Sequence, residues 1–323
     1  MGVKAGDLVA GKDYPRSFPQ LQSWFADDDA CRAYLEKLRW PDGFVCPACA
    51  SKRKWRIGTG AWMCGDCGRK TTVTAGTIFD RTRSPLSVWF AAVWFVCAQK
   101  NGVSALGLQR VLGLGSYETA WAWMHKLRRA MVRPDRDLLD GLVEVDETYF
   151  GGVNKLPGYD GRGTSKSLIV IAVEMPPGHL GRVRLARLPE LSGAALRGFV
   201  NQTVAKGVTV RTDGLNLYRR LGADGYRHTP INVSASGDPA HIAMPGVHRV
   251  ASLLNRWLTG TLHYSVSDKH LDYYLDEFTF RFNRRDAHSR GLLFYRLLEQ
   301  AVATEPHPLE TLTAEPLDHN IWE

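Results

Sequence analysis

The chain contains no long hydrophobic run, and this absence argues against a segment that crosses a membrane. Its most apolar stretch, Val88–Ala98, has 11 residues, whereas a helix that spans a bilayer needs about 20. The first residues, MGVKAGDLVAGKDY, likewise contain no apolar core of signal-peptide length. We therefore expect no membrane partner, and we expect Val88–Ala98 to form a buried helix.

Cysteine is scarce, with 6 residues among 323, and this scarcity excludes a small disulfide-rich scaffold. Four of these cysteines form two C-x-x-C pairs, a pattern that indicates metal binding in a reducing compartment. Cys31 and Cys97 stand apart from the pairs on apolar helical faces, where they are predicted to be small core residues.

Acidic residues are outnumbered by basic ones. The chain has 41 Lys and Arg against 33 Asp and Glu, so its formal net charge is +8. Such a balance favours a polyanionic partner but carries no information about the fold. The 44% hydrophobic and 23% charged composition is that of a globular protein, and a length of 323 residues predicts two domains with a small additional module.

The two cysteine pairs predict a structural zinc site. They are Cys46 with Cys49 and Cys64 with Cys67, and 14 residues separate one pair from the other. Each pair presents two thiolates from one turn, and four thiolates close a tetrahedral site that suits Zn²⁺ and leaves no open position for catalysis. Free buried cysteines or a redox pair are the alternatives, and two pairs at this spacing favour zinc over both.

A basic segment with aromatic residues lies between the two cysteine pairs. Its cations are Lys52, Arg53, Lys54 and Arg56, and Trp55 and Trp62 are interleaved with them. Basic and aromatic side chains on a zinc ribbon suit contact with a nucleic-acid backbone. A solvated charged loop is the alternative interpretation.

Residues 81–136 are predicted to form a helical DNA-binding region. The expected helices span residues 85–99, 104–112 and 116–131. The turn at residues 113–115 has the length expected of a helix-turn-helix. The helix after it carries Lys126, Arg128 and Arg129, which we expect to contact DNA. Alternatively, the motif is a helical hairpin whose final cations complement the helix dipole.

From Leu142 onward the sequence alternates between strand and helix patterns. The expected strands cover residues 142–150, 167–175, 182–188, 208–213 and 229–234, and the expected helices cover 192–205, 214–221, 246–258 and 267–284. This order predicts an α/β fold in which helices pack on a mixed sheet.

Acidic residues within this strand pattern are candidates for a metal site. Asp146 lies within one expected strand, and Asp213 ends another. Two aspartates on adjacent strands can jointly hold Mg²⁺ with a substrate phosphate. Alternation along the strand puts Glu144 on the face of Asp146 and points Glu147 the opposite way. Taken singly, each aspartate is also explained as an exposed acid at a strand end.

Three strings in this half of the chain resemble the DDE transposases of bacterial insertion sequences. They are VEVDETYFGG, RTDG and HRVASLLNRWLTGTLHYSVSDKHLDYYLDEFTFRFNRR, the last at residues 248–285. Together with CPAC and CGDC they match the group that carries an N-terminal zinc ribbon, over about residues 20–300. The resemblance implies an RNase H-like catalytic core in which Asp146 is the first metal ligand and Asp213 the second.

The third ligand position departs from the all-acidic pattern. In relatives with glutamate there, that residue precedes a Ser-Leu-Leu-Lys-Arg stretch, and residues 252–256 (SLLNR) fit this stretch here. His248 therefore takes the place of the acid and Asn255 that of the lysine. The 34 residues between Asp213 and His248 fit the group. The resemblance implies His248 as a ligand of Mg²⁺ or Mn²⁺, with Asn255 and Arg256 available to DNA.

The expected organisation joins these parts. Residues 1–40 form an arm and helix, 41–80 the zinc ribbon, 81–136 the helix-turn-helix region, 137–302 the RNase H-like catalytic domain and 303–323 a tail. The resemblance implies a transposase that cleaves and joins double-stranded DNA as a homodimer or higher oligomer. The reducing compartment that the cysteine pattern indicates is expected to be the cytoplasm, or the nucleoid within it. The alternative is a non-catalytic DNA-binding protein, derived from a transposase, that uses only its ribbon and helix-turn-helix.

Overall fold

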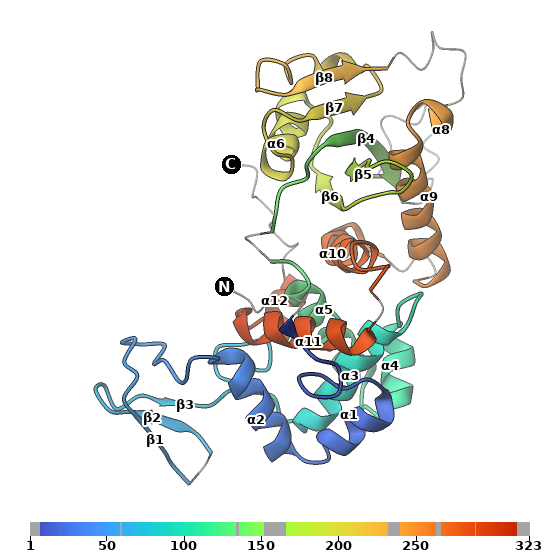
Figure 1. The fold of residues 1–323 in the computed structure, drawn as a ribbon. Helices are drawn as coiled ribbons and strands as arrows, with labels where there is room; N and C mark the ends of the chain where they lie inside the picture. The colour runs from blue at the N-terminus through green and yellow to red at the C-terminus, as the bar shows by residue number, and fades with distance from the viewer. Residues whose placement is uncertain are drawn as a thin grey trace. The chain divides into compact units, whose positions relative to one another are not determined.

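The computed structural model divides the chain into two compact units (Figure 1). It describes residues 7–58, 60–133, 136–151, 166–231, 240–262, 266–287 and 289–314. The first unit consists of the chain up to Arg133 together with Asp286–Ala314, and the second unit contains the segment between these two parts. Among the residues that the structure describes, no helix is long and apolar enough to cross a bilayer.

The first unit combines helices with one small sheet. Its helices are α1 (Phe18–Trp24), α2 (Asp28–Arg39), α3 (Leu86–Ala98), α4 (Ala105–Leu112), α5 (Tyr117–Ala130), α11 (Arg290–Ala303) and α12 (Leu309–Ala314). The antiparallel sheet has the order β1 (Lys54–Arg56), β2 (Trp62–Cys64) and β3 (Lys70–Thr71). Asp27, Ser104 and Ser116 cap α2, α4 and α5, because each side chain accepts a backbone N–H of the first turn.

The helical pair expected from the sequence is present as α4 and α5. Gly113 ends α4 in the left-handed conformation, with φ 63° and ψ 32°, which glycine adopts without steric cost. The apolar helix α3 packs beside the pair, and the rings of Trp89 and Trp123 stack with centroids 3.7 Å apart. These contacts bury the apolar side of α5.

An aromatic cluster assigns α11 to the first unit. The ring of Phe294 lies 5.7 Å from that of Phe90 and 5.9 Å from that of Trp94, measured between centroids. Phe25 of the N-terminal segment lies 6.1 Å from Phe294 by the same measure. The sequence predicts a catalytic domain that extends to residue 302, whereas the structure places α11 in the first unit. The aromatic side chains of α11 are buried among α2 and α3, far away in the sequence.

The second unit is built on a five-stranded mixed sheet with the order β6-β5-β4-β7-β8. Its strands are β4 (Leu142–Phe150), β5 (Ser167–Glu174), β6 (Val183–Leu188), β7 (Thr209–Thr212) and β8 (Arg227–Pro230). β5 is antiparallel to both β4 and β6, whereas β7 is parallel to both β4 and β8. The predicted fold class, a mixed sheet with flanking helices, is confirmed.

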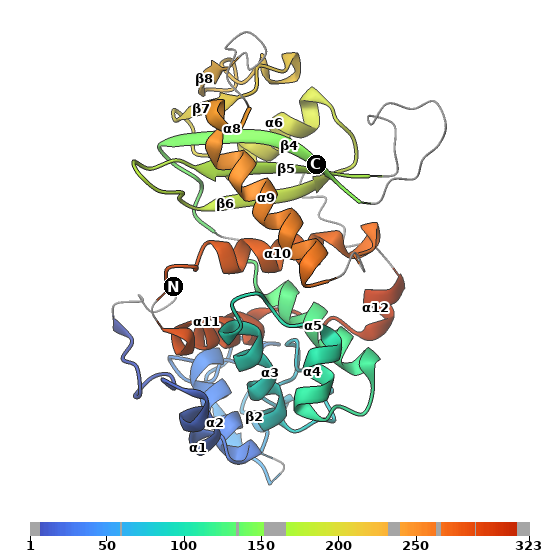
Figure 2. The ribbon, with the colours of Figure 1, turned by 90° about the vertical axis from the view of Figure 1, so that its right-hand side faces the viewer.

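Helices cover both faces of this sheet. They are α6 (Gly193–Thr203), α8 (Ala240–Ala243), α9 (Pro245–Gly260) and α10 (Leu271–Phe282), with short 3-10 turns η2 (Asn216–Tyr218) and η3 (Asp268–His270). In Figure 2, α9 crosses in front of β4, β5 and β6, and α6 lies behind them. Successive side chains of β5 point to opposite faces of the sheet. Val170 packs in the core with α6, and Ile169 and Ile171 pack with α9.

The buried carboxylate of Glu144 holds the start of α9 on the sheet. Glu144 is 0% exposed, and its Oε2 accepts the backbone N–H groups of Gly246 at 2.7 Å and Val247 at 3.2 Å. Pro245, the first residue of α9, has no N–H to satisfy. The first turn of α9 is thus tied to β4 by a negative charge at its positive end, and His248 follows directly.

The close approach of α9 to the sheet requires a glycine at position 246. A Cβ atom there would clash with the side chain of Met175 and lie 2.8 Å from Glu144 Oε2. Only a residue without a side chain lets the helix backbone come this near to the carboxylate.

We predict that Glu144→Ala lowers the free energy of unfolding by about 2–4 kcal/mol, because two buried N–H groups lose their acceptor. Glu144→Gln should cost about 1 kcal/mol, since its amide oxygen still accepts but the charge that faces the helix dipole and Arg211 Nη1, 3.4 Å from Oε1, is gone. Denaturant unfolding of the full chain measures both. Glu190→Ala, at an exposed position, is the control and should stay within about 0.5 kcal/mol. A Glu144→Ala protein as stable as the unmodified chain would contradict this role.

Candidate catalytic and zinc sites

Parallel pairing of β4 with β7 brings two of the predicted metal ligands to one edge of the sheet. The register aligns Glu144 with Arg211, so Asp146 and Asp213 each stand two residues beyond the last aligned pair. Asp146 lies in β4, and Asp213 directly follows β7. Because parallel strands run in the same direction, the two aspartates meet at the same end of the pairing.

A third carboxylate, that of Glu147, joins the two aspartates. Asp146, Glu147 and Asp213 each place a carboxylate oxygen within 4.8 Å of the others. Strand alternation predicts that Glu147 points away from Asp146, so the sequence pattern does not place it in the site. The structure turns its carboxylate toward the site, where Glu147 Oε2 accepts a hydrogen bond from the hydroxyl of Tyr218 at 2.8 Å. The only sequence signal for Glu147 is that it adjoins Asp146.

His248 lies beside Asp146 but outside this group of three carboxylates. Its Nε2 is 4.0 Å from Asp146 Oδ2, and its side chain is 35% exposed. Two ligands that each lie about 2.1 Å from one Mg²⁺ ion are at most about 4.2 Å apart. The position of His248 in the first turn of α9 therefore leaves it within reach of a cation bound to Asp146.

The carboxylates of the site are partly buried and repel one another. Burial is the main cause that raises the pKa of Asp146 to about 7, and the charges of Glu147 and Asp213 raise it further. Burial also raises the pKa of Glu147, although the hydrogen bond from Tyr218 acts in the opposite direction. Carboxylate oxygens are the ligands that Mg²⁺ and Mn²⁺ prefer, and a divalent cation relieves this repulsion. The donor set therefore fits a divalent cation.

The four cysteines predicted to bind zinc come together in the first unit. Each places its Sγ within 4.8 Å of the others. Cys46 Sγ lies 3.6 Å from Cys67 Sγ, and Cys49 Sγ lies 3.5 Å from Cys64 Sγ. Backbone N–H groups of Cys67 and Asp66 lower the pKa of Cys64 to about 6, which favours the thiolate that a metal binds. The cluster fits Zn²⁺.

The two cysteine turns share one backbone geometry. The carbonyl of Cys46 accepts the N–H of Ala50 at 2.9 Å, and the carbonyl of Cys64 accepts that of Gly68 at 3.1 Å. Ala50 and Gly68 have φ of 58° and 69°. Each turn thus ends in the left-handed conformation, which directs both thiols of a pair toward the same point.

Comparisons with known proteins match both halves of this description. A model of the ISXO2-like transposase domain matches residues 138–283, and a model of the transposase zinc-ribbon domain matches residues 26–70. The chain is 26% identical over 276 residues to an uncharacterized protein in transposable element ISH50 of Halobacterium salinarum, covering 80% of this chain and 91% of that protein.

The chain belongs to the DDE transposases that carry an N-terminal zinc ribbon. The five-stranded mixed sheet with its flanking helices is the RNase H-like fold of this family. Family membership and the carboxylate group together support a nuclease or transposase activity, and both modules support DNA binding.

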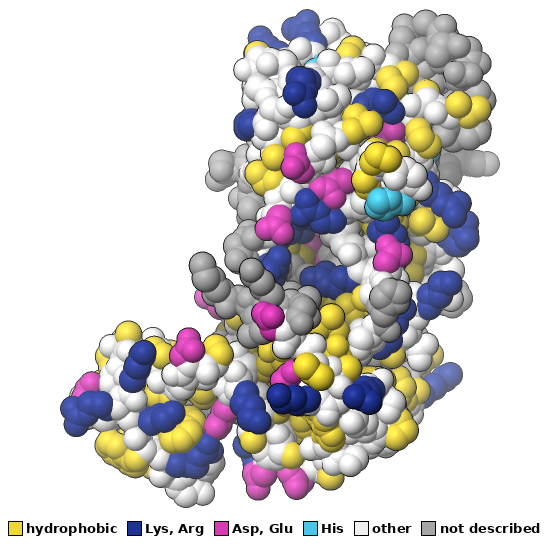
Figure 3. All heavy atoms as spheres, in the orientation of Figure 1, with side chains coloured by type: hydrophobic (Ala, Val, Ile, Leu, Met, Phe, Trp, Pro, Cys, Tyr) yellow, Lys and Arg dark blue, Asp and Glu magenta, His cyan; other side chains and the backbone are white. Residues whose placement is uncertain are grey.

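The ribbon of this transposase exposes basic side chains. On the face shown in Figure 3, Lys and Arg side chains lie beside hydrophobic ones over β1 and β2. Lys52 and Lys54 are exposed, whereas Arg53 pairs with Asp66 at 2.6 Å and Arg56 with Glu36 at 2.6 Å. The Arg56 pair joins β1 to α2, which accords with a family match that already begins at residue 26.

The structure distinguishes among the predicted DNA-binding cations of α5. Arg128 is 2% exposed, so burial argues against the predicted contact between its side chain and DNA. Lys126 is half-buried, and burial lowers its pKa, while Arg129 is also half-buried. Tyr117, in the first turn of α5, is 53% exposed. Among these residues of α5, the most exposed one therefore lies at the start of the helix.

Along α9, exposed polar residues continue from His248. Ser252, Asn255 and Arg256 are exposed, whereas Val250 and Leu254 are buried against the sheet. Spacings of four, seven and eight residues put the exposed ones on the helix side that carries His248. Asn255 and Arg256 are thus accessible for DNA contact.

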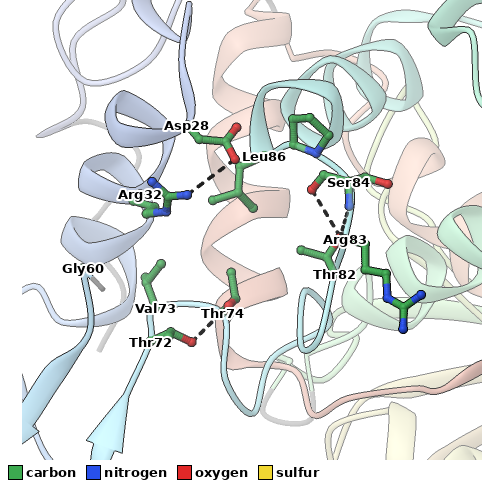
Figure 4. Close-up of a pocket in the computed structure, with 11 residues that line it drawn as sticks. Asp28, Arg32, Gly60, Thr72, Val73, Thr74, Thr82, Arg83, Ser84 and Leu86 are labelled. Atoms are coloured by element: carbon green, nitrogen blue, oxygen red, sulfur yellow. Dashed lines mark hydrogen bonds and ion pairs between the residues drawn. The ribbon is translucent and has the colours of Figure 1, made fainter. Parts of the chain in front are cut away.

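A hollow of about 400 Å³ lies between α2, the end of the ribbon and the loop before α3 (Figure 4). Its lining includes the hydroxyl-bearing side chains of Thr72, Thr74, Thr82 and Ser84. The cationic side chains and hydroxyl groups of the lining would suit a bound phosphate. However, the lining also contains the carboxylate of Asp28, whose Oδ1 accepts the N–H of Ser87 at the start of α3 and whose Oδ2 lies 3.7 Å from Arg32 Nη2. The hollow thus holds its own carboxylate, which disfavours the binding of an anion there.

We predict one zinc ion per chain, and we expect Cys64→Ser to lose it because three thiolates no longer close the tetrahedral site. Native mass spectrometry of the full chain counts the metal. Cys31→Ala removes a buried cysteine outside the cluster and should keep the zinc. A folded chain without zinc would contradict the assignment.

We predict that the protein without added Mg²⁺ or Mn²⁺ loses stability as the pH rises from about 4 to about 7. The pKa of Asp146 is raised on folding, so the native state binds the proton more tightly and its advantage disappears once that proton leaves. At pH 8, the free energy of unfolding of Asp146→Asn should therefore be about 2 kcal/mol higher than that of the unmodified chain. Thermal unfolding with zinc retained measures this difference. Asp42→Asn, at an exposed position, is the control, and equal stability of both proteins at pH 8 would rule out the proposed repulsion.

Proposed function

We propose that the chain is an active transposase that binds the ends of a mobile DNA element and carries out metal-dependent DNA cleavage and strand transfer. One observation carries this proposal: the carboxylates of Asp146 and Asp213 converge at the sheet edge, and His248 lies beside Asp146. Membership of the DDE transposases supports the reaction class, and converging metal ligands are what displacement at a phosphodiester requires.

In this proposal Asp146 and Asp213 hold a divalent cation, either Mg²⁺ or Mn²⁺. When bound, the cation supplies Lewis-acid stabilisation to the phosphodiester and to the oxygen that attacks it. Asp146 is close to both Asp213 and His248. Its carboxylate can therefore bind a cation together with either of these residues. Ionisation of Asp146 is a condition for binding, because a protonated carboxyl cannot ligate the cation in the same way.

His248 occupies the third ligand position in this proposal. A neutral imidazole leaves the site with one negative charge fewer than a glutamate would. Protonation removes the lone pair that ligates, so His248 serves as a ligand only in its neutral form. Glu144 supports this role from β4 because its carboxylate holds the N–H groups directly before His248.

Basic and polar side chains outside the metal site are assigned to the DNA backbone. The ribbon offers Lys52, Arg53, Lys54 and Arg56, α5 offers Lys126 and Arg129, and α9 offers Asn255 and Arg256. Cations that neutralise phosphates release counterions, so binding through these residues should weaken steeply with salt. We assign double-stranded DNA as the partner, a homodimer or higher oligomer on DNA as the assembly, and the cytoplasm with its nucleoid as the location.

We predict that Asp146→Asn and Asp213→Asn each reduce strand cleavage by about a hundredfold or more, because each removes a charged ligand at the reacting phosphate. Binding to element-end DNA, measured by fluorescence anisotropy, should stay unchanged. Asp42→Asn is the matched control for both measurements. Cleavage at the unmodified rate in either variant would exclude that aspartate. An unmodified chain that binds DNA but cleaves nothing with Mg²⁺ or Mn²⁺ would favour the non-catalytic DNA-binding alternative.

For the third position, we predict that His248→Ala loses cleavage, whereas His248→Glu keeps or gains Mg²⁺-dependent cleavage. The glutamate restores a charged oxygen ligand at the same place on α9. In the unmodified chain, activity should fall as the pH drops and the imidazole protonates, and this fall should be smaller in His248→Glu. Cleavage rates across pH, with DNA binding as a control, separate these outcomes. If His248→Ala cleaves at the unmodified rate, His248 is not a ligand.

A further inference from the structure

The carboxylate of Glu147 reaches a position that strand alternation alone does not explain. Side chains of neighbouring residues in a strand point to opposite faces, and Asp146 and Asp213 carry the same charge as Glu147. A flexible glutamate next to two like charges is expected to turn toward solvent. Its carboxylate instead lies within 4.8 Å of an oxygen of both aspartates.

Tyr218 accounts for this position. Its hydroxyl donates to Glu147 Oε2 at 2.8 Å, and its side chain is 0% exposed in the apolar cluster that includes Phe199 and Val210. A buried hydroxyl without a partner costs about 1–3 kcal/mol. Releasing Glu147 to solvent would impose that cost on Tyr218, so the hydrogen bond opposes the repulsion from the aspartates.

We propose that Glu147 supplies a third carboxylate to the divalent cation held by Asp146 and Asp213, and that Tyr218 is a positioning residue that keeps it there. Tyr218 engages one carboxylate oxygen of Glu147, and the other oxygen remains for the cation. A third charged oxygen ligand strengthens the binding of a small hard cation. This inference rests on the proposed function, because it concerns the same cation site.

The test uses Mn²⁺ as the probe and the full chain with its zinc retained. Isothermal titration calorimetry measures the Mn²⁺ dissociation constant without any need for cleavage. We expect Glu147→Gln to weaken Mn²⁺ binding by about tenfold or more, and Tyr218→Phe, which removes only the hydroxyl, by about tenfold. In a Glu147→Gln background, Tyr218→Phe should cause no further loss, because the tyrosine acts through Glu147.

Tyr226→Phe is the matched control for Tyr218→Phe. Tyr226 is buried in the same apolar cluster, and its hydroxyl donates to Asn201 Oδ1 at 3.1 Å rather than to a carboxylate of the site. We expect Tyr226→Phe to leave the Mn²⁺ dissociation constant unchanged. Equal losses in Tyr218→Phe and Tyr226→Phe would show a merely structural effect and overturn the positioning role.

Asp146→Asn separates this inference from the proposed function. If Asp146→Asn loses Mn²⁺ binding while Glu147→Gln binds as the unmodified chain does, the inference fails and the proposed cation site stands. If Asp146→Asn also binds Mn²⁺ with unchanged affinity, the proposed cation site itself fails. Should Glu147→Gln not fold, Tyr218→Phe decides alone: unchanged affinity overturns the inference, and a loss that Tyr226→Phe lacks supports it.

Discussion

Parallel pairing of β4 with β7 is the constraint on which the candidate catalytic site depends. The pairing aligns Glu144 with Arg211 and so sets Asp146 and Asp213 at the same level of the sheet. A shift of one residue would turn Asp146 to the opposite face, because the side chains of a strand alternate. β4 also carries the carboxylate that holds the first turn of α9. One strand therefore sets the position of both an aspartate and the histidine beside it.

The site gathers negative charge where a folded chain ordinarily avoids it. Burial and the neighbouring charges raise the pKa of Asp146 to about 7, so the site is unfavourable for folding when every carboxylate is ionised. Other partners limit this cost: backbone N–H groups satisfy Glu144, and Tyr218 satisfies Glu147. A cation that binds only the folded state stabilises that state. The stability of the folded state and the proposed chemistry thus depend on the same bound cation.

In the zinc ribbon, cysteines take the place that an apolar core holds elsewhere. The hydrophobic cluster described for the ribbon comprises Phe44, Cys46 and Cys64, with Trp40 and Trp62 packed against it. A segment this small buries too little apolar surface to fold on that basis alone, so we expect zinc bound by the four thiolates to supply much of its stability. Its strands can therefore keep their cations exposed, which suits the proposed contact with DNA.

The sequence by itself determined the features that depend on local spacing. Three features follow from residues that are close together in the chain. They are the C-x-x-C pairs, the strand patterns that contain or precede Asp146 and Asp213, and the periodicity of α9 with His248 in its first turn. Only the tertiary structure decided that Glu147 turns toward the aspartates, that Arg128 is buried and that α11 belongs to the first unit. The physical reason is that these features depend on partners distant in sequence. Tyr218 holds Glu147 from 71 positions away, and α11 packs among helices from the other end of the chain.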